Sequence, residues 1–276
     1  MTTYTKLFAS MMIAFAITAC SSTPEQEIAP VEDVVPVEQL YNQAMAAVLA
    51  GEYETAAPQF DEVERQHPYS VWAIQAQLMS AYALYQDNNY DDAIAALDRF
   101  IRLNPGNANA AYAHYLKGLS YYEQIADVGR DQLMTRLALE TFDILIKRFP
   151  ESKYTRDARL KVDLTRNHLA GKEMSVGRYY AERGQFLAAI NRFRTVVEQY
   201  DTTEQVPEAL HRLTELYLAL GLTQEAQRTA AILSHNYPGS AWYADSYTVV
   251  TTGKSTGEDE DKSVVDRVWS GLLGLF

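Results

Sequence analysis

The sequence predicts an all-α protein, a right-handed α-solenoid of five tetratricopeptide-repeat helical hairpins in two lobes, with flexible termini. Three features recur together: an alanine, a mostly large apolar residue four positions later, and a proline or aspartate twelve positions later. The alanine lets two antiparallel helices approach closely, the large residue fills the gap, and the proline ends the second helix. The alanines and their endpoints are Ala56 and Pro68, Ala93 and Pro105, Ala138 and Pro150, Ala189 and Asp201, and Ala226 and Pro238.

Each hairpin also carries its filling residue and a turn signal. A glycine or asparagine stands a few residues before four of the alanines, where the turn between the two helices belongs. These turn residues are Gly51, Asn88, Asn89, Gly184 and Gly221, and the filling positions are Phe60, Leu97, Phe142, Phe193 and Ala230.

The spacing between successive alanines shows where the repeats depart from the usual period of about 34 residues. The four spacings are 37, 45, 51 and 37 residues. An insertion around residues 125–131 lengthens the third repeat, and residues 152–172 are expected to form a lengthened helix. That helix would divide the solenoid into a lobe of repeats one to three, residues 37–151, and a lobe of the long helix with repeats four and five, residues 152–250.

The first residues have the pattern of a bacterial lipoprotein signal. Lys6 precedes an apolar run, and small residues stand before Cys20, which fits a signal peptide over residues 1–19. Cys20 is the only cysteine and cannot form an internal disulfide, so we expect it to carry the lipid. An ordinary signal peptide with a chance cysteine is the alternative. Residues 20–36, rich in proline and acidic side chains, would form a flexible lipidated tether.

The carboxy-terminal end differs in kind from the repeats. Residues 251–262 contain two glycines and an acidic run, and are expected to form an acidic linker. Residues 263–276 are amphipathic and are expected to be helical. This helix would either cap the exposed core of the last repeat or dock on a partner or on the bilayer surface.

Composition excludes some classes of partner. The formal net charge is −12 at pH 7, and an acidic chain lacks the basic face that releases counterions from a polyanion, so nucleic acid is excluded. Nineteen tyrosines favour a binding protein over a metabolic enzyme, because tyrosine combines a rigid apolar ring with a polar tip. No second apolar run is long enough to span a membrane, so the lipid would be the anchor.

No catalytic, metal or cofactor site is expected. The five histidines are scattered without metal spacing on one helix face, and no cysteine remains for nucleophilic chemistry. A glycine-rich phosphate loop is also missing. An enzyme with an unrecognised site is therefore a disfavoured alternative.

An aromatic groove is expected on repeats two and three, because the first helix of each such hairpin lines the concave face. It would suit an extended or amphipathic peptide that has aromatic residues of its own. The alternative is that these tyrosines pack between helices with their hydroxyls in water. The predicted groove residues are Leu78, Tyr82, Tyr85, Tyr112, Tyr115 and Tyr122.

Repeats four and five are richer in charged residues. Arginines and glutamates alternate there, which favours a protein partner held by paired ions. The alternative is that these arginines are simply solvated on helix surfaces. The residues concerned are Arg178, Glu182, Arg183, Arg192, Arg194, Glu208, His211, Arg212 and Glu215.

Several segments resemble the BamD (ComL-type) family, the tetratricopeptide-repeat lipoproteins of the outer-membrane β-barrel assembly machinery. The likeness covers residues 37–246 and the lipoprotein signal. It is more specific than the repeat alone, because the arginine-rich run before Pro105 is not part of the generic pattern. The segments are Leu97 to Pro105, Tyr115 to Leu119, Ser175 to Gly184, and Ala189 to Phe193.

The resemblance implies a non-enzymatic scaffold on the periplasmic face of the outer membrane, where Ser21 after the lipidated cysteine fits sorting to that membrane. Its implied partners are the BamA periplasmic domains, unfolded outer-membrane β-barrel proteins and other Bam lipoproteins. Substrates would contact the amino-terminal repeats, and BamA the carboxy-terminal ones through Tyr179, Arg183, Arg192 and Arg194. The open alternative is a pilotin-like or cell-envelope scaffold lipoprotein that binds a secretin or a peptidoglycan synthase.

Overall fold

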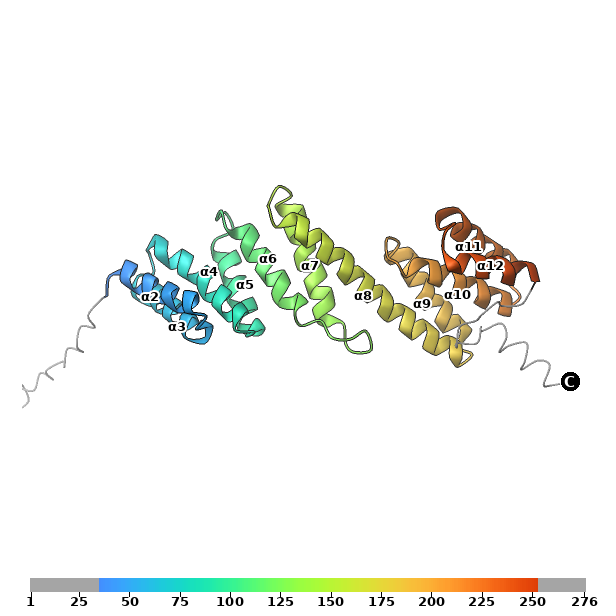
Figure 1. Ribbon diagram of the computed structural model, residues 1–276, viewed down its shortest axis with the longest axis horizontal. Coiled ribbons are helices and arrows are strands. Elements are labelled where there is room, and N and C mark those ends of the chain that lie inside the picture. The colour runs from blue at the N-terminus through green and yellow to red at the C-terminus, as the bar shows by residue number, and fades with distance from the viewer. Residues whose placement is uncertain (1–34, 253–276) are drawn as a thin grey trace, which may run out of the picture. The chain divides into compact units, whose positions relative to one another are not determined.

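The computed structural model describes residues 35–252, and every regular element in that range is an α-helix (Figure 1). None of the described helices is long and apolar enough to cross a membrane. The helices are α2 (Val37–Ala50), α3 (Tyr53–Gln66), α4 (Val71–Gln86), α5 (Tyr90–Leu103), α6 (Ala110–Tyr122), α7 (Leu133–Arg148), α8 (Thr155–Glu182), α9 (Phe186–Gln199), α10 (Val206–Ala219), α11 (Thr223–Asn236) and α12 (Ala241–Thr252).

The helices form five antiparallel hairpins, which confirms the predicted all-α tetratricopeptide-repeat architecture. The pairs are α2 with α3, α4 with α5, α6 with α7, α8 with α9, and α10 with α11, and each hairpin also packs on the next one along the chain. The predicted signal peptide, Cys20, most of the tether and the amphipathic segment 263–276 lie outside the described residues. So does the predicted acidic linker beyond Thr252.

The turns between paired helices use a left-handed residue, as the sequence signals predicted. Gly51, Gly184 and Gly221 have φ values of 77°, 71° and 73°, and Asn88 takes the same place in the second hairpin with φ 61°. Glycine has no Cβ to oppose this conformation, and asparagine is one of the few other residues that tolerate it. The chain therefore reverses within a few residues and brings the second helix back against the first.

Two of the hairpins close on a contact between a glycine and a large ring. Gly118 of α6 faces Phe142 of α7, and Gly177 of α8 faces Phe193 of α9; a Cβ at either glycine would lie 2.5 Å from the ring. Both phenylalanines are fully buried. The rings therefore occupy space that only a glycine leaves open, and the crossing holds the two helices at a fixed, short separation.

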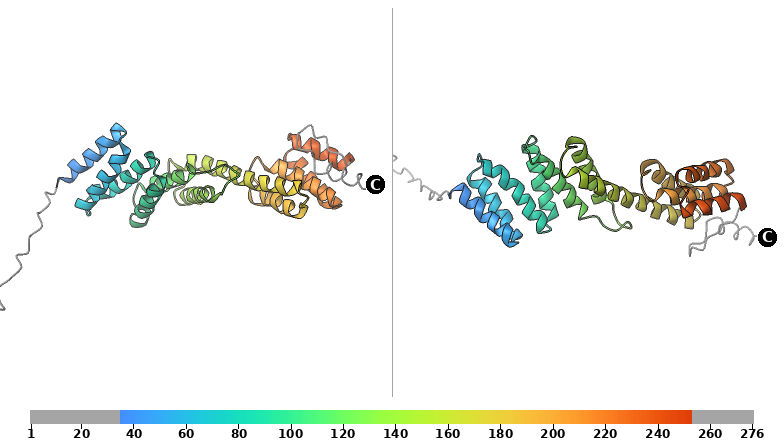
Figure 2. Two further views of the ribbon diagram at one scale, coloured as in Figure 1. Left: turned by 90° about the horizontal axis from the view of Figure 1, so that it is seen from below. Right: turned by 45° about the horizontal axis from the view of Figure 1, so that its top comes forward.

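The long helix α8 belongs to two hydrophobic cores. Ala158 and Val162, near its start, pack with residues of α6 and α7, whereas Ala170 and Met174 pack with residues of α9 and α10. Figure 2 shows α8 running from α7 to α9 without a break. The lengthened helix expected at residues 152–172 and the first helix of repeat four are thus a single helix of 28 residues.

A helix that the sequence did not predict as a separate element covers the last hairpin. α12 packs on α10 and α11. Ser246 of α12 is fully buried and its Oγ is hydrogen-bonded to Nδ1 of His211, 2.8 Å away, while Trp242 lies against the His211 ring at 5.2 Å between centroids. Next to His211, Arg212 donates a hydrogen bond to the buried Glu215 at 3.1 Å. The described residues therefore already contain a cap for the fifth repeat.

The Gly177 contact generates a stability prediction. Gly177→Ala is expected to destabilise the protein by about 1–2 kcal/mol, because the strain of overpacking against Phe193 exceeds the helical preference of alanine over glycine. Gly171→Ala, in the same helix, meets only Val128 at an ordinary 3.6 Å and should stabilise by about 0.5–1 kcal/mol. Urea unfolding of both variants measures the difference. Equal stabilities would contradict the assigned crossing.

His211 generates a second prediction, for pH. Burial lowers the pKa of His211, Arg212 acts in the same direction, and Glu215, Asp245 and Glu208 oppose them. Below about pH 6.5, the ordinary histidine pKa, the unfolded chain therefore binds more protons than the folded one, and stability falls as the pH falls. We expect this loss between about pH 7 and pH 5 to be smaller in His211→Gln, which still offers Ser246 a polar group. Identical losses in urea unfolding of both proteins would refute the assignment.

Candidate functional site

The predicted groove residues lie on α4 and α6, and the structure places most of them at the border between core and solvent. Tyr82, Tyr85 and Tyr112 are half-buried against the core formed by α4, α5 and α6. Leu78 differs, because it is only 6% exposed and belongs to that core itself. The surface available to a ligand is therefore made by the tyrosines, and Leu78 supports it from below.

Two of the groove tyrosines pack on a residue that the sequence analysis missed. Tyr154, just before α8, stacks on Tyr115 at 5.0 Å between centroids and lies 5.2 Å from Tyr112. The Tyr115 hydroxyl donates to Oδ2 of Asp157 at 2.7 Å. Tyr154 could have been found from its position four residues after Pro150, because Trp72 and Trp242 stand four residues after Pro68 and Pro238.

Aromatic neighbours from α3 and α5 extend this surface. Tyr53 lies edge-on to Tyr82 at 6.5 Å, and Tyr90 lies 5.7 Å from Tyr85. Tyr53 and Tyr90 are the first residues of α3 and α5. Both closely follow the turn signals, so the repeat contains a recurrent aromatic position that spacing alone could have revealed.

The electrostatics of this surface favour the neutral form of Tyr112 and Tyr115. Burial raises the pKa of Tyr112, with further contributions from Tyr82 and Tyr154. Burial also raises the pKa of Tyr115, and its hydrogen bond to Asp157 adds to the effect. On the other side, the Lys161 ammonium lies over the Tyr122 ring at 4.4 Å. The surface thus offers aromatic faces and neutral hydroxyls, which suit apolar and aromatic side chains together with polar backbone groups.

The residues predicted for the second lobe do not form one cluster. Arg183 lies over the Tyr179 ring at 4.2 Å, and both are exposed at the end of α8. Arg192 of α9 instead donates to Glu173 of α8 at 3.0 Å, while Arg194 pairs with Glu198 in its own helix at 2.7 Å. Residues two apart on a helix point in different directions, so Arg192 and Arg194 serve different faces.

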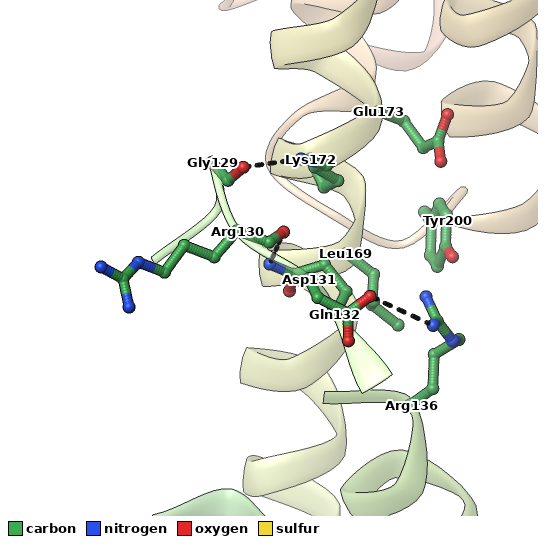
Figure 3. A pocket seen from close by; sticks show the side chains of 9 residues that line it. All are labelled: Gly129, Arg130, Asp131, Gln132, Arg136, Leu169, Lys172, Glu173 and Tyr200. Atoms are coloured by element: carbon green, nitrogen blue, oxygen red, sulfur yellow. Dashed lines mark hydrogen bonds and ion pairs between the residues drawn. The ribbon is translucent and has the colours of Figure 1, made fainter. Parts of the chain in front are cut away.

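A cavity of about 400 Å³ opens beside the Arg192–Glu173 ion pair. The predicted insertion forms its rim and is fastened to α8, since Lys172 donates to the Gly129 carbonyl at 3.1 Å and His168 bonds to the Ala126 carbonyl at 2.9 Å. The lining residues, drawn in Figure 3, are Gly129, Arg130, Asp131, Gln132, Arg136, Leu169, Lys172, Glu173 and Tyr200. The insertion is therefore an ordered part of a charged surface.

The profile of the YfiO family, described as outer membrane lipoprotein, matches residues 33–250. The outer membrane protein assembly factor BamD of Caulobacter vibrioides is 46% identical over 242 residues, which are 88% of this chain and 79% of that relative. BamD of Rickettsia prowazekii is 41% identical over 247 residues, 89% of this chain and 97% of that relative. Among solved structures, a thermophilic TPR protein of Thermus thermophilus is 17% identical with a TM-score of 0.37, covering 78% of this chain and 98% of its own.

Proposed function

The chain belongs to the YfiO family of outer membrane lipoproteins, and we propose that it is a non-enzymatic scaffold for assembling β-barrel proteins into the outer membrane. The observation that carries this proposal is the 46% identity over 88% of the chain with a protein named as an outer membrane protein assembly factor. A row of helical hairpins fits the role, because it presents extended surfaces to protein partners. Cys20 would be acylated and hold the protein on the periplasmic face, since several acyl chains anchor a protein stably.

We further propose that the tyrosine surface of α4 and α6 binds unfolded barrel proteins. Tyr82, Tyr112 and Tyr115 present partly exposed rings and hydroxyl groups, which can contact aromatic side chains of an extended chain and its backbone at once. Tyrosine loses little conformational freedom on binding. The surface is therefore suited to a range of sequences that share aromatic content.

The exposed arginines of α8 and α9 are proposed for the BamA side. Arg192 is held by Glu173 in the free protein, so a carboxylate of BamA would have to compete with that pair. Such an exchange of one carboxylate for another adds little net affinity but selects an acidic partner. Tyr179 and Arg183 together would offer an aromatic face and a positive charge at the end of α8.

Depletion of the protein tests the function. We expect unfolded porins to accumulate when it is removed, because their assembly would lack the scaffold. The measurement is the fraction of porin in the heat-modifiable, folded form over time after depletion. If porins fold normally while a secretin fails to assemble, the pilotin-like alternative is correct and the proposal is wrong.

Two sets of variants test the division between the surfaces. Arg192→Glu is expected to weaken binding of the BamA periplasmic domains by about 2–5 kcal/mol, because it sets a negative charge opposite the BamA carboxylate and replaces attraction by repulsion. The same variant should bind an aromatic-ended barrel peptide normally. The pair Tyr82→Ala and Tyr115→Ala should show the reverse pattern.

Arg228→Glu provides a matched control for the arginine, because Arg228 is also an exposed helix residue paired with a glutamate, Glu225. Titrations of each variant with both ligands, together with melting temperatures, give the result. If either set weakens both ligands equally at unchanged thermal stability, the two surfaces do not act separately.

A further inference from the structure

The cavity beside the insertion collects positive charge on an acidic protein. The chain has a net charge of −12, yet Arg130, Arg136 and Lys172 all line this one cavity. Arg166 is close enough to influence Tyr200 from outside the lining. Several cations at one place on an acidic protein are expected either to pair with nearby carboxylates or to bind an anionic ligand.

The two acidic residues of the lining already have partners. Glu173 accepts a hydrogen bond from Arg192 at 3.0 Å. Asp131 accepts one from the backbone N–H of Leu133 at 2.9 Å, at the start of α7, where a carboxylate is favourable. Glu173 is thus committed to Arg192, and Asp131 keeps one oxygen that reaches Arg136 only at 4.0 Å, so the positive charge of Arg136 is weakly compensated.

The cations of the lining are not equivalent. The Lys172 amine is occupied by the Gly129 carbonyl, and the Arg130 side chain points away from the cavity in Figure 3. The Arg136 guanidinium lies next to Tyr200, and its charge has only the distant Asp131 carboxylate as an ion-pair partner among the described residues, 4.0 Å away. Arg136 is therefore the cation of the lining that faces Tyr200 with most of its donors unused.

Tyr200 supplies a neutral donor beside Arg136. Burial raises the pKa of Tyr200 and Glu173 adds to it, while Arg136 and Arg166 oppose them. Its hydroxyl has no hydrogen-bond partner among residues 35–252. The Arg136 guanidinium and the half-buried Tyr200 hydroxyl thus both line the cavity, and no acceptor in the described residues bridges them.

We propose that this cavity binds a carboxylate, held by the Arg136 guanidinium and the Tyr200 hydroxyl. The planar fork of arginine donates two parallel hydrogen bonds to a carboxylate, and a hydroxyl can serve a remaining lone pair. The cavity volume of about 400 Å³ admits an acidic side chain or the end of a peptide. The site itself follows from the geometry, and only the identity of the carboxylate rests on the proposed function.

Two sources of the carboxylate are consistent with that function. An aspartate or glutamate side chain of the BamA periplasmic domains would place the cavity beside the Arg192 contact. The free carboxyl end of an unfolded barrel protein would make the cavity a second substrate contact. Both present the same chemical group, so the experiment separates them by competition.

The first measurement uses N-acetylglutamate and the mature chain with Cys20→Ser, followed through the side-chain Nε resonances of arginine. We expect a saturable shift of the Arg136 resonance. The affinity should fall about tenfold in Tyr200→Phe, the effect of losing one hydrogen bond to a charged group, and vanish in Arg136→Gln. Arg130→Gln removes an equal charge from the neighbouring loop and should change the affinity less than about twofold.

The second measurement adds competitors. Displacement by a barrel-protein peptide in its free-acid form, but not as the amide, assigns the carboxylate to a chain end; displacement by the BamA domains assigns it to an acidic side chain. If neither competes, the cavity remains a carboxylate site and its link to the proposed function is overturned. An absent Arg136 shift, or equal losses in Arg130→Gln and Arg136→Gln, would overturn the site itself.

Discussion

The contact between a large ring and a small residue on the facing helix is the constraint on which the hairpins around α8 depend. Gly118 and Gly177 leave room for the rings of Phe142 and Phe193, and no larger residue would fit without displacing them. The fifth hairpin differs, because its filling position is the small Ala230, and Thr214 instead bonds to the neighbouring Thr229. Helix separation set in this way determines which residues of the first helices remain exposed to partners.

The length of α8 follows from its part in two cores. Its first half closes the core of α6 and α7, and its second half supplies Gly177 to the crossing with α9. One helix therefore serves two hairpins, and the insertion at residues 125–131 is hydrogen-bonded to it through His168 and Lys172. The cavity lined by Arg136 and Tyr200 arises where this loop, rather than a helix, meets α8.

Local sequence signals predicted the hairpins because each depends on residues close in the chain. The turn at Gly184 and the filling residue Phe193 have a chemical reason that is visible in the sequence alone. The sites were less predictable, because they join residues far apart. Tyr115 of α6 contacts Tyr154 and Asp157 at the start of α8, and this contact depends on how the insertion and α7 between them are placed. Leu78 was predicted as a groove residue but lies in the core, since periodicity gives a helix face without giving its depth.

Helix α8 contacts both proposed surfaces, and its rigidity keeps a change at one from reaching the other. Asp157 accepts a hydrogen bond from the Tyr115 hydroxyl, and Glu173 accepts one from Arg192. The two carboxylates stand sixteen residues apart, which is about 24 Å along the helix. A carboxylate that takes Arg192 from Glu173 changes a side-chain contact at the surface. It alters Asp157 only if the whole helix moves, and such a movement would have to repack both cores in which α8 is buried. If both proposed surfaces bind their partners, anchoring one helix in two cores predicts that they bind independently.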